Sequence, residues 1–298
     1  MSDAVYKGRL EGLEIAFTYA RTAAAVNEIV VLHDCDPVAA HLLGRAVTAG
    51  VMAAALLPKE QRVNICWRYP GLLKTLVVDA GEDGTVRGMC SPTSLQEAPD
   101  EQALFGDIGD IQVVTSQAGR ILNSGTTPVS LHDPVSDFGY HFAISDQVET
   151  ALCATIAFQP DMENPIKMAQ GWMLQALPGC DLPLFERLRR RMEGAAFRRV
   201  ATQVAGLEEG MAEAIQLLCA EEAAYQGMHV EQASSPQFAC TCSEEKMKAV
   251  LRAIPIQERM QLVKDRESSR IRCQFCSRAF TFDIEACIAV WNSHPASE

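Results

Sequence analysis

The pattern of hydrophobic residues changes about 178 residues into this chain of 298 residues. Before that point, short runs rich in β-branched and aromatic residues predict strands. After it, charged and alanine-rich stretches predict helices. The strand-like runs are "RVNICWRY", "LLKTLVVDAGEDGTVRGMC" with a hairpin turn at Asp83-Gly84, "DIQVVTSQ", "TTPVSLH", "ALCATIAF" and "KMAQGWMLQAL".

One long apolar stretch in the first part, "DPVAAHLLGRAVTAGVMAAALL", predicts a buried helix. Asp36 is a suitable N-cap, and Pro37 fits the first helical position because its missing N–H has no helical partner there. The stretch is apolar nearly all round, but Arg45 interrupts it. We therefore expect a core helix, not a membrane span, and no membrane partner.

The middle of the chain separates its charges. Residues 187–199 hold six arginines against one acid, Glu193, whereas residues 208–231 hold six acids and no lysine or arginine. Such a segment either exposes solvated helical faces or packs on another part of the protein and pairs charges with it. The stretch "QGMHVEQASSPQF" that follows is interpreted as a linker, because Ser-Ser-Pro lies at its centre.

These patterns predict an α+β protein in three parts. Residues 1–178 form a mixed α/β core with a large β-sheet, residues 179–232 form a helical linker domain, and residues 233–298 form a small C-terminal module. A module of about sixty residues is hard to stabilise by its own apolar core. A bound metal would supply the missing stability.

Four of the eleven cysteines stand in two close pairs in this module, Cys240 with Cys242 and Cys273 with Cys276, and 30 residues separate the pairs. Zinc held by four thiolates typically uses two such pairs, and structural zinc contributes ~10–16 kcal/mol to the folding of small modules. A dithiol redox pair and a disulfide framework are the alternatives. The sequence between the pairs predicts a helix with Ser243 as N-cap and apolar residues at helical spacing, namely Met247, Val250, Leu251 and Ile254.

The first pair also suits a redox sensor. A disulfide between Cys240 and Cys242 would close a small, strained ring that is comparatively easy to reduce. Zinc keeps its ligands as thiolates, which is the form that oxidants attack. The four cysteines therefore combine the chemistry of a metal site with that of a reversible switch.

The other seven cysteines are scattered. Strand-like surroundings predict core positions for Cys66, Cys90 and Cys153. Cys287 follows the second pair on a predicted helix and is a candidate spare ligand. Plain packing is the default for the remaining three, Cys35, Cys180 and Cys219.

Composition limits the classes of function. The net charge of −12 argues against a nucleic-acid partner, because such affinity comes largely from cations that neutralise phosphates. No secretory signal is visible at the start, so we expect a reducing cytoplasm, where thiols persist or bind metal. Two rival functions remain. "CQFC" suggests a thiol-disulfide oxidoreductase, and the two pairs suggest a zinc-ribbon nucleic-acid-binding protein.

The order of the three parts resembles the thirty-three-kilodalton redox-regulated heat-shock chaperone family, also called the chaperonin HslO family. "CTCSEEKMKAVL" and "CQFCSRAFTFD" are similar to its two zinc-binding blocks, and "LGRAVTAGVMAAALL", "DGTVRG" and "LQALPG" resemble its core segments. The chain departs from the family in lacking a glycine in "RESSRIRC" and in having Phe280 in place of a tyrosine. Neither departure changes a cysteine of the two pairs.

The resemblance implies a function. The protein would be an ATP-independent holdase, not an enzyme, that binds unfolding client proteins during oxidative stress. Reduced, the four cysteines would hold zinc. Oxidation would pair Cys240 with Cys242 and Cys273 with Cys276, release zinc, unfold the module, undock the linker and expose apolar surface, and the oxidised form would be a homodimer.

Overall fold

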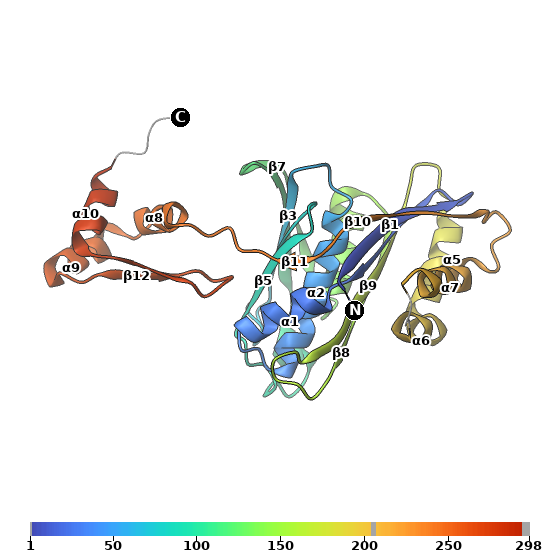
Figure 1. The fold of residues 1–298 in the computed structure, drawn as a ribbon, viewed down its shortest axis with the longest axis horizontal. Helices are drawn as coiled ribbons and strands as arrows, with labels where there is room; N and C mark the ends of the chain where they lie inside the picture. The colour runs from blue at the N-terminus through green and yellow to red at the C-terminus, as the bar shows by residue number, and fades with distance from the viewer. Residues whose placement is uncertain (1, 204–206, 294–298) are drawn as a thin grey trace. The chain divides into compact units, whose positions relative to one another are not determined.

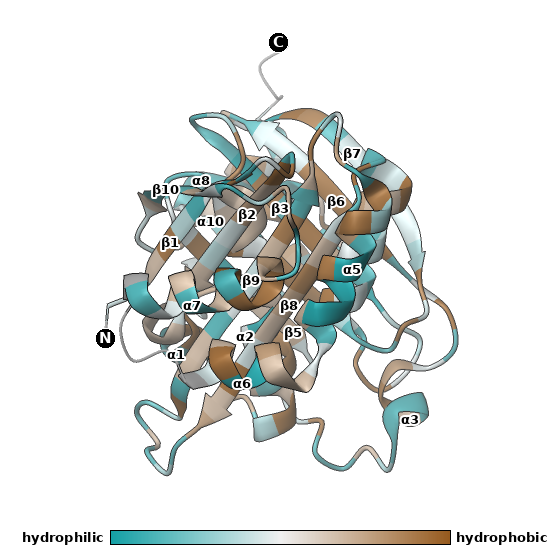
Figure 2. Ribbon diagram, turned by 90° about the vertical axis from the view of Figure 1, so that its right-hand side faces the viewer, coloured by the Kyte–Doolittle hydropathy of each residue, from teal (hydrophilic) through white to brown (hydrophobic). Residues whose placement is uncertain are grey.

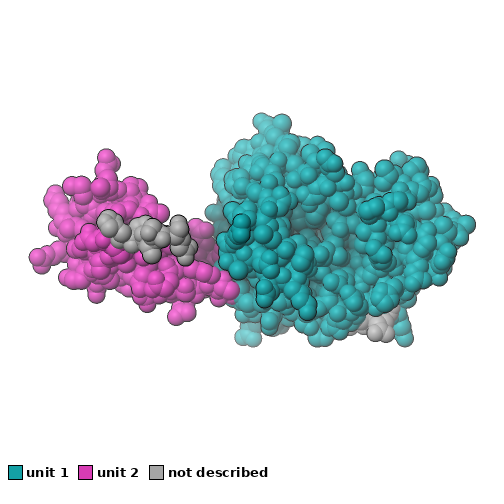
Figure 3. All heavy atoms as spheres, turned by 90° about the horizontal axis from the view of Figure 1, so that it is seen from above, with its two compact units in different colours: residues 1–239 teal, residues 240–298 magenta. Residues whose placement is uncertain are grey.

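The computed structural model describes residues 2–203 and 207–293 of the chain. The chain divides into two compact units, Met1–Ala239 and Cys240–Glu298, which Figure 3 shows in different colours. The first unit contains both large sheets, and the second contains the four paired cysteines. This architecture of helices and large sheets confirms the predicted α+β class.

Two β-sheets form the framework of the first unit (Figure 1). The five-stranded sheet has, in spatial order, β10 (Gly227–Ser234), β1 (Ala4–Glu11), β2 (Ile15–Arg21), β9 (Ile166–Ala176) and β8 (Thr150–Phe158). The six-stranded sheet has β11 (Gln237–Phe238), β5 (Thr85–Ser91), β4 (Thr75–Gly81), β3 (Gln61–Arg68), β6 (Gly109–Gln117) and β7 (Arg120–Val129). All pairings are antiparallel except that of β11 with β5.

Helix α2 (Pro37–Ala54) packs on strands of both sheets and forms the centre of the main core. It starts as predicted, because the Asp36 carboxylate accepts a hydrogen bond from the Ala39 N–H at 2.8 Å. The approach to β9 is close, since a Cβ on Gly171 would lie 2.6 Å from Met52. Among the described residues, α2 alone has the length and hydropathy of a membrane span, but 78% of that window is buried inside the protein. It is therefore a core helix, as predicted.

A layer of three helices covers the other face of the five-stranded sheet (Figure 2). These are α5 (Leu182–Glu193), α6 (Ala195–Gln203) and α7 (Leu207–Cys219). Successive side chains of β9 point to opposite faces of the sheet, so the strand contributes to two apolar clusters. Met173 belongs to the cluster around α2, whereas Trp172 and Leu174 belong to the cluster under α5–α7. The remaining helices of the unit are α1 (Ala23–Leu32), α3 (Glu101–Phe105) and α4 (Pro134–His141), which continues into the π-helical turn η1 (Phe142–Asp146).

The second unit is small. Its elements are α8 (Glu244–Arg252), α9 (Ile256–Asp265), the hairpin β12 (Ser269–Arg272) and β13 (Ala279–Phe282), and α10 (Ile284–Asn292). Ser243 caps α8 as predicted, because its hydroxyl accepts from the Lys246 N–H at 3.3 Å. Four side chains form the buried core of this unit, Leu251, Phe282, Cys287 and Val290. Val250, one of the apolar residues at helical spacing on α8, is 49% exposed.

The interpretation of residues 226–238 as a linker is partly wrong. Gly227–Ser234 is the edge strand β10, which pairs with β1 from Ser234 opposite Val5 to Gly227 opposite Glu11. Its half-buried Met228 and Val230 pack against the cluster under α5–α7. Only the short Ser-Pro connection before β11 remains irregular. Local sequence patterns did not predict this strand, because its partner β1 lies more than two hundred residues away in the chain.

Candidate metal centre

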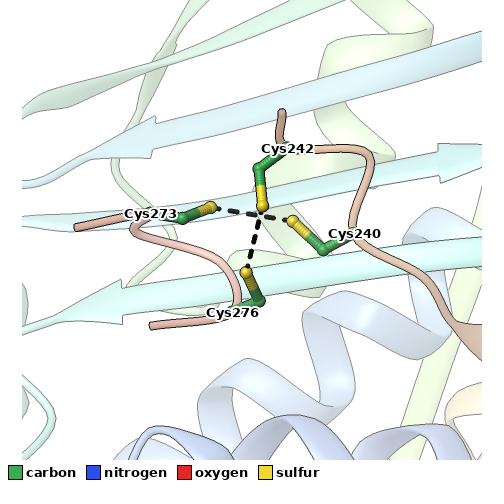
Figure 4. A group of neighbouring side chains, drawn as sticks. All are labelled: Cys240, Cys242, Cys273 and Cys276. Atoms are coloured by element: carbon green, nitrogen blue, oxygen red, sulfur yellow. Dashed lines mark hydrogen bonds between the residues drawn. The ribbon is translucent and has the colours of Figure 1, made fainter. Parts of the chain in front are cut away.

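Four sulfur atoms meet at one point of the second unit. The Sγ atoms of Cys240 and Cys273 are 3.6 Å apart, those of Cys242 and Cys276 are 3.3 Å apart, and all four lie within 4.8 Å of one another (Figure 4). The close contacts cross between the two sequence pairs. The fold therefore brings together all four cysteines that the spacing singled out.

Two short loops position these cysteines. Cys240 and Cys242 lie between β11 and α8, where the Ser243 cap fixes the start of the helix directly after the pair. Cys273 and Cys276 lie in the turn between β12 and β13. The turn is closed by a hydrogen bond from the Cys273 N–H to the Arg278 carbonyl at 2.9 Å. Such a turn holds two thiols on one side of a hairpin, unlike a thioredoxin-like pair, which lies at the start of a helix.

The sulfur arrangement fits a tetrahedral metal ion. A tetrahedron with metal–sulfur bonds of about 2.3 Å has edges of about 3.8 Å, close to the 3.3 and 3.6 Å of the two nearest pairs. A disulfide needs about 2.05 Å, so these contacts are between separate sulfurs. The donor set therefore fits a metal that favours four thiolates in this geometry, as zinc and iron–sulfur centres do.

The thiols need a cation to ionise together. Burial and the neighbouring thiols raise the pKa of Cys242 above its ordinary value, and burial raises that of Cys276. A hydrogen bond from the Arg278 backbone acts in the other direction on Cys276. A bound divalent ion would lower these pKa values, because a metal deprotonates the thiols that coordinate it.

Trp291, which the sequence analysis did not single out, joins two helices of the second unit. The Trp291 indole N–H donates to the Leu251 carbonyl at 2.9 Å and so ties α10 to the end of α8. The Arg259 guanidinium lies 5.7 Å from the centre of the same ring. Helix α10, predicted from the sequence after the second cysteine pair, begins at the capping carboxylate of Asp283, which accepts from the Ala286 N–H.

Cys287 lies away from the four sulfurs. It is fully buried in the core of the second unit, and its thiol donates to the Phe282 carbonyl at 3.7 Å. Among the described residues, the ligand cluster contains Cys240, Cys242, Cys273 and Cys276 but not Cys287. The candidate spare ligand is therefore a core residue.

The cysteines of the first unit only partly follow the predictions. Cys90 is buried as expected, and Cys219 is buried under the helical layer. Cys153 is half-buried and packs against the cluster under α5–α7, whereas Cys66 is half-buried outside both clusters, so its prediction as a core residue is wrong. Cys66 lies between the buried residues Ile65 and Trp67 and so takes the other face of β3.

The separated charges of the middle segment pair with each other. Arg187 and Arg191 of α5 both contact the Glu222 carboxylate, at 2.8 and 2.9 Å. Arg191 also contacts Glu221 at 2.8 Å, and Arg189 contacts Glu149 next to β8 at 2.5 Å. Of the two interpretations of this segment, packing with charge pairing describes α5, which also buries four apolar side chains.

The fold and the site define a class of protein, an α+β core followed by a small unit with a four-cysteine metal centre. The chain belongs to the Hsp33 family, because the family model described as Hsp33 protein matches residues 3–283. Related proteins named 33 kDa chaperonin include one from Clostridium botulinum (strain 657 / Type Ba4), 25% identical over 95% of both chains. Another, from Clostridium perfringens (strain SM101 / Type A), is 26% identical over 96% of this chain and 90% of its own.

A solved structure shares the fold. The crystal structure of the 33 kDa chaperonin (heat shock protein 33 homolog) from Thermotoga maritima matches 98% of each chain with a TM-score of 0.78 at 19% identity. Family membership and the shared name of the relatives support a chaperone function for this protein.

Proposed function

We propose that this protein is a redox-regulated, ATP-independent chaperone that holds unfolding proteins during oxidative stress. The observation that carries the proposal is the cluster of four cysteine sulfurs within 4.8 Å of one another in a unit with little other core. Under this proposal residues 1–178 bind clients, residues 179–232 mask the binding surface, and residues 233–298 are the redox switch.

Zinc at Cys240, Cys242, Cys273 and Cys276 would supply the cross-link that the second unit otherwise lacks. The unit buries four side chains as its core, and α9, which the structure describes in full, has no buried residue. A structural zinc contributes ~10–16 kcal/mol, which exceeds the ~1.5–3 kcal/mol that one buried apolar side chain contributes. The fold of this unit would therefore depend on its thiolates.

Oxidation removes the ligands. Each disulfide that forms would give up two electrons from a pair of zinc-bound thiolates. Hydrogen peroxide accepts them with two protons from the solvent and leaves as two waters, or hypochlorous acid accepts them with one proton and leaves as water and chloride. The resemblance to the family assigns the pairs as Cys240–Cys242 and Cys273–Cys276. Sulfurs joined in pairs no longer coordinate as four thiolates, so the unit loses its main stabilising element.

The helical layer covers the surface that a client would need. On the sheet, the buried side chains beneath α5–α7 include Phe17, Tyr19, Trp172 and Leu174. On the helices, Leu188, Met192 and Phe197 face the same cluster. Undocking would expose both sides, and large contiguous apolar surfaces of this kind bind other proteins. An unfolding protein that displays its own apolar residues is the partner we propose.

The chain offers a route from the switch to this layer. Strand β11 ends two residues before Cys240 and is held to β5 by a short parallel pairing. Strand β10 precedes it at the edge of the five-stranded sheet and is joined to α7 by residues 220–226. Edge strands with one neighbour are among the first elements to open locally. Loss of the second unit would thus favour release of β11, β10 and then α7.

We further propose a reducing cytoplasm as the location, because thiolate-bound zinc persists there, and a homodimer as the oxidised form. We propose no nucleic-acid, membrane or enzymatic role. The test measures zinc content and suppression of client aggregation on one preparation before and after peroxide treatment. Zinc release together with a gain of activity is expected. Activity that is equal in the zinc-loaded and oxidised forms would contradict regulation by this centre.

A further inference from the structure

Two cysteines of the first unit lie side by side, Cys35 and Cys90. Cys35 lies in the turn between α1 and α2, and Cys90 lies near the end of β5. The two thiols share a hydrogen bond. Cys90 is buried in the main apolar cluster, and the half-buried Cys35 packs against that cluster. The four-cysteine centre belongs to the other unit, so this pair is separate from it.

Backbone hydrogen bonds hold the two cysteines in this arrangement. The Asp36 N–H donates to the Thr93 carbonyl at 2.9 Å. The Asp36 carboxylate accepts from the Leu95 N–H and, at 2.7 Å, from the Gln96 N–H. These bonds attach the residue after Cys35 to the segment that follows β5. The backbone therefore places the two thiols next to each other, and their contact does not depend on two flexible side chains alone.

The two thiols differ in their access to solvent. Cys35 is half-buried in a turn whose neighbour Asp34 is exposed, whereas Cys90 is 3% exposed. An oxidant therefore reaches Cys35 first, and Cys90 is placed to react with the oxidised sulfur. The hydrogen bond with Cys90 and burial raise the pKa of Cys35. A protonated thiol is a slow nucleophile, so Cys35 should react later than the metal-bound thiolates of the centre.

We propose that Cys35 and Cys90 are a second redox site, which forms a disulfide when oxidation continues after the four-cysteine centre has reacted. Hydrogen peroxide oxidises the Cys35 thiol to a sulfenic acid and releases one water. The Cys90 sulfur then displaces the hydroxyl group as a second water and forms the S–S bond. The two thiols thus give two electrons and two protons to one peroxide, which leaves as two waters.

The disulfide joins the turn after α1 to β5. Strand β5 pairs with β4 on one side and with β11 on the other, and α1 packs against both β5 and β11. The cross-link closes a loop with 54 residues between the two cysteines, and such a cross-link restricts the unfolded chain more than the folded one. Oxidation therefore stabilises the first unit under the conditions that, by the proposed function, unfold the second. The disulfide itself does not depend on that function.

Peptide mapping tests the disulfide directly. Trypsin leaves Cys35 as the single cysteine of residues 22–45 and Cys90 as the single cysteine of residues 88–120. Reduced, zinc-loaded protein is treated with increasing hydrogen peroxide, blocked with N-ethylmaleimide and digested without reductant. We expect mass spectrometry to show these two peptides joined. Half-maximal joining should need at least about tenfold more peroxide than half-maximal zinc release. A mixture of 15N-labelled and unlabelled protein should give no mixed pairs, because the link lies within one chain.

Three variants provide the controls. Cys35→Ser should abolish the joined peptides and leave Cys90 as a free thiol, whereas Cys90→Ala should leave Cys35 as a sulfinic or sulfonic acid. Cys66→Ser removes another half-buried thiol of the same unit and should not change the joining. Overoxidised Cys35 beside a free Cys90 in the parent, Cys35 joined to another cysteine, mixed-isotope pairs, or joining that precedes zinc release overturns the proposal.

Thermal unfolding separates this site from the proposed function. The parent for this test is a full-length variant without the centre, namely Cys240→Ser, Cys242→Ser, Cys273→Ser and Cys276→Ser. Peroxide should raise the unfolding temperature of its first unit, followed by the near-ultraviolet circular dichroism of the buried Trp67 and Trp172. Adding Cys35→Ser should remove the rise. Joined peptides without a rise overturn the stabilising role, and the absence of joined peptides in this variant overturns the site, whether or not the centre regulates chaperone activity.

Discussion

The packing of Phe197 against Trp172 offers a direct test of whether α6 masks a binding surface. Phe197 is 1% exposed, and its ring meets that of Trp172 edge-on at a centroid distance of 5.7 Å. Replacing a buried phenylalanine by alanine costs ~3–5 kcal/mol. Because alanine is the best helix former, Phe197→Ala weakens the docking of α6 on the sheet and not the helix itself.

The loss is large enough to change the population of the docked state. A difference of about 3 kcal/mol shifts an equilibrium roughly a hundredfold. The reduced, zinc-loaded variant should therefore suppress the aggregation of a thermally unfolding test protein without oxidant, as measured by light scattering. Arg199→Ala is the matched control, because Arg199 lies on the same helix and is exposed.

Hydrogen exchange of the α6 amides decides what a negative result means. Faster exchange in Phe197→Ala than in Arg199→Ala shows that the helix has undocked. If exchange accelerates and the reduced variant still fails to suppress aggregation, the sheet face beneath α6 is not the client surface. If exchange does not change, the docking energy assigned to Phe197 is wrong.

Three further predictions concern the switch and the charge pairs. The Cys240→Ser, Cys273→Ser double variant should bind no zinc by metal analysis, and full retention of one zinc would contradict the four-cysteine site. The hydrogen bond from Arg187 lowers the pKa of Glu222. The ionised Glu222 therefore stabilises the folded protein above the carboxyl's unfolded pKa of about 4.3, and this contribution is lost as the pH falls through the folded pKa. Urea unfolding should show Glu222→Gln less stable than the parent at neutral pH and equal to it in acid; a difference that persists in acid would assign the effect to packing. Peroxide activation should survive when three cysteines outside the centre are replaced together, namely Cys66, Cys90 and Cys153. Loss of activation in a folded triple variant would show that at least one of them takes part in switching.

Local sequence signals predicted those parts of the fold that depend on neighbours in the chain. The cap at Asp36, the cap at Ser243 and the strands β3 to β6 each follow from a few adjacent residues, and the structure contains all of them. The four-cysteine cluster followed from spacing, because the coordination geometry of one metal ion restricts which thiols can meet.

The sequence alone did not predict which distant strands pair or which face of a strand is buried. Strand β10 is specified by its contact with β1 at the other end of the chain, and the hairpin of β1 and β2 carries Tyr6, Lys7 and Arg9 among its apolar residues. The exposure of Cys66 depends on which face of β3 the helix α2 covers. Such facts depend on tertiary contacts that single-sequence patterns do not record.

The unequal cores of the two units would allow the proposed metal-based switch to act on one unit and not the other. The first unit is held by two apolar clusters that contain most of the buried residues, so loss of a metal elsewhere leaves its folding free energy largely intact. The apolar cluster of the second unit has only four buried side chains, so under the proposal the folding of this unit would depend on the ion that cross-links it. Under the proposed function, a perturbation of the four cysteines would reach β11 first, because β11 ends just before Cys240 and pairs with β5 over two residues, and would then pass along the chain to β10 and α7.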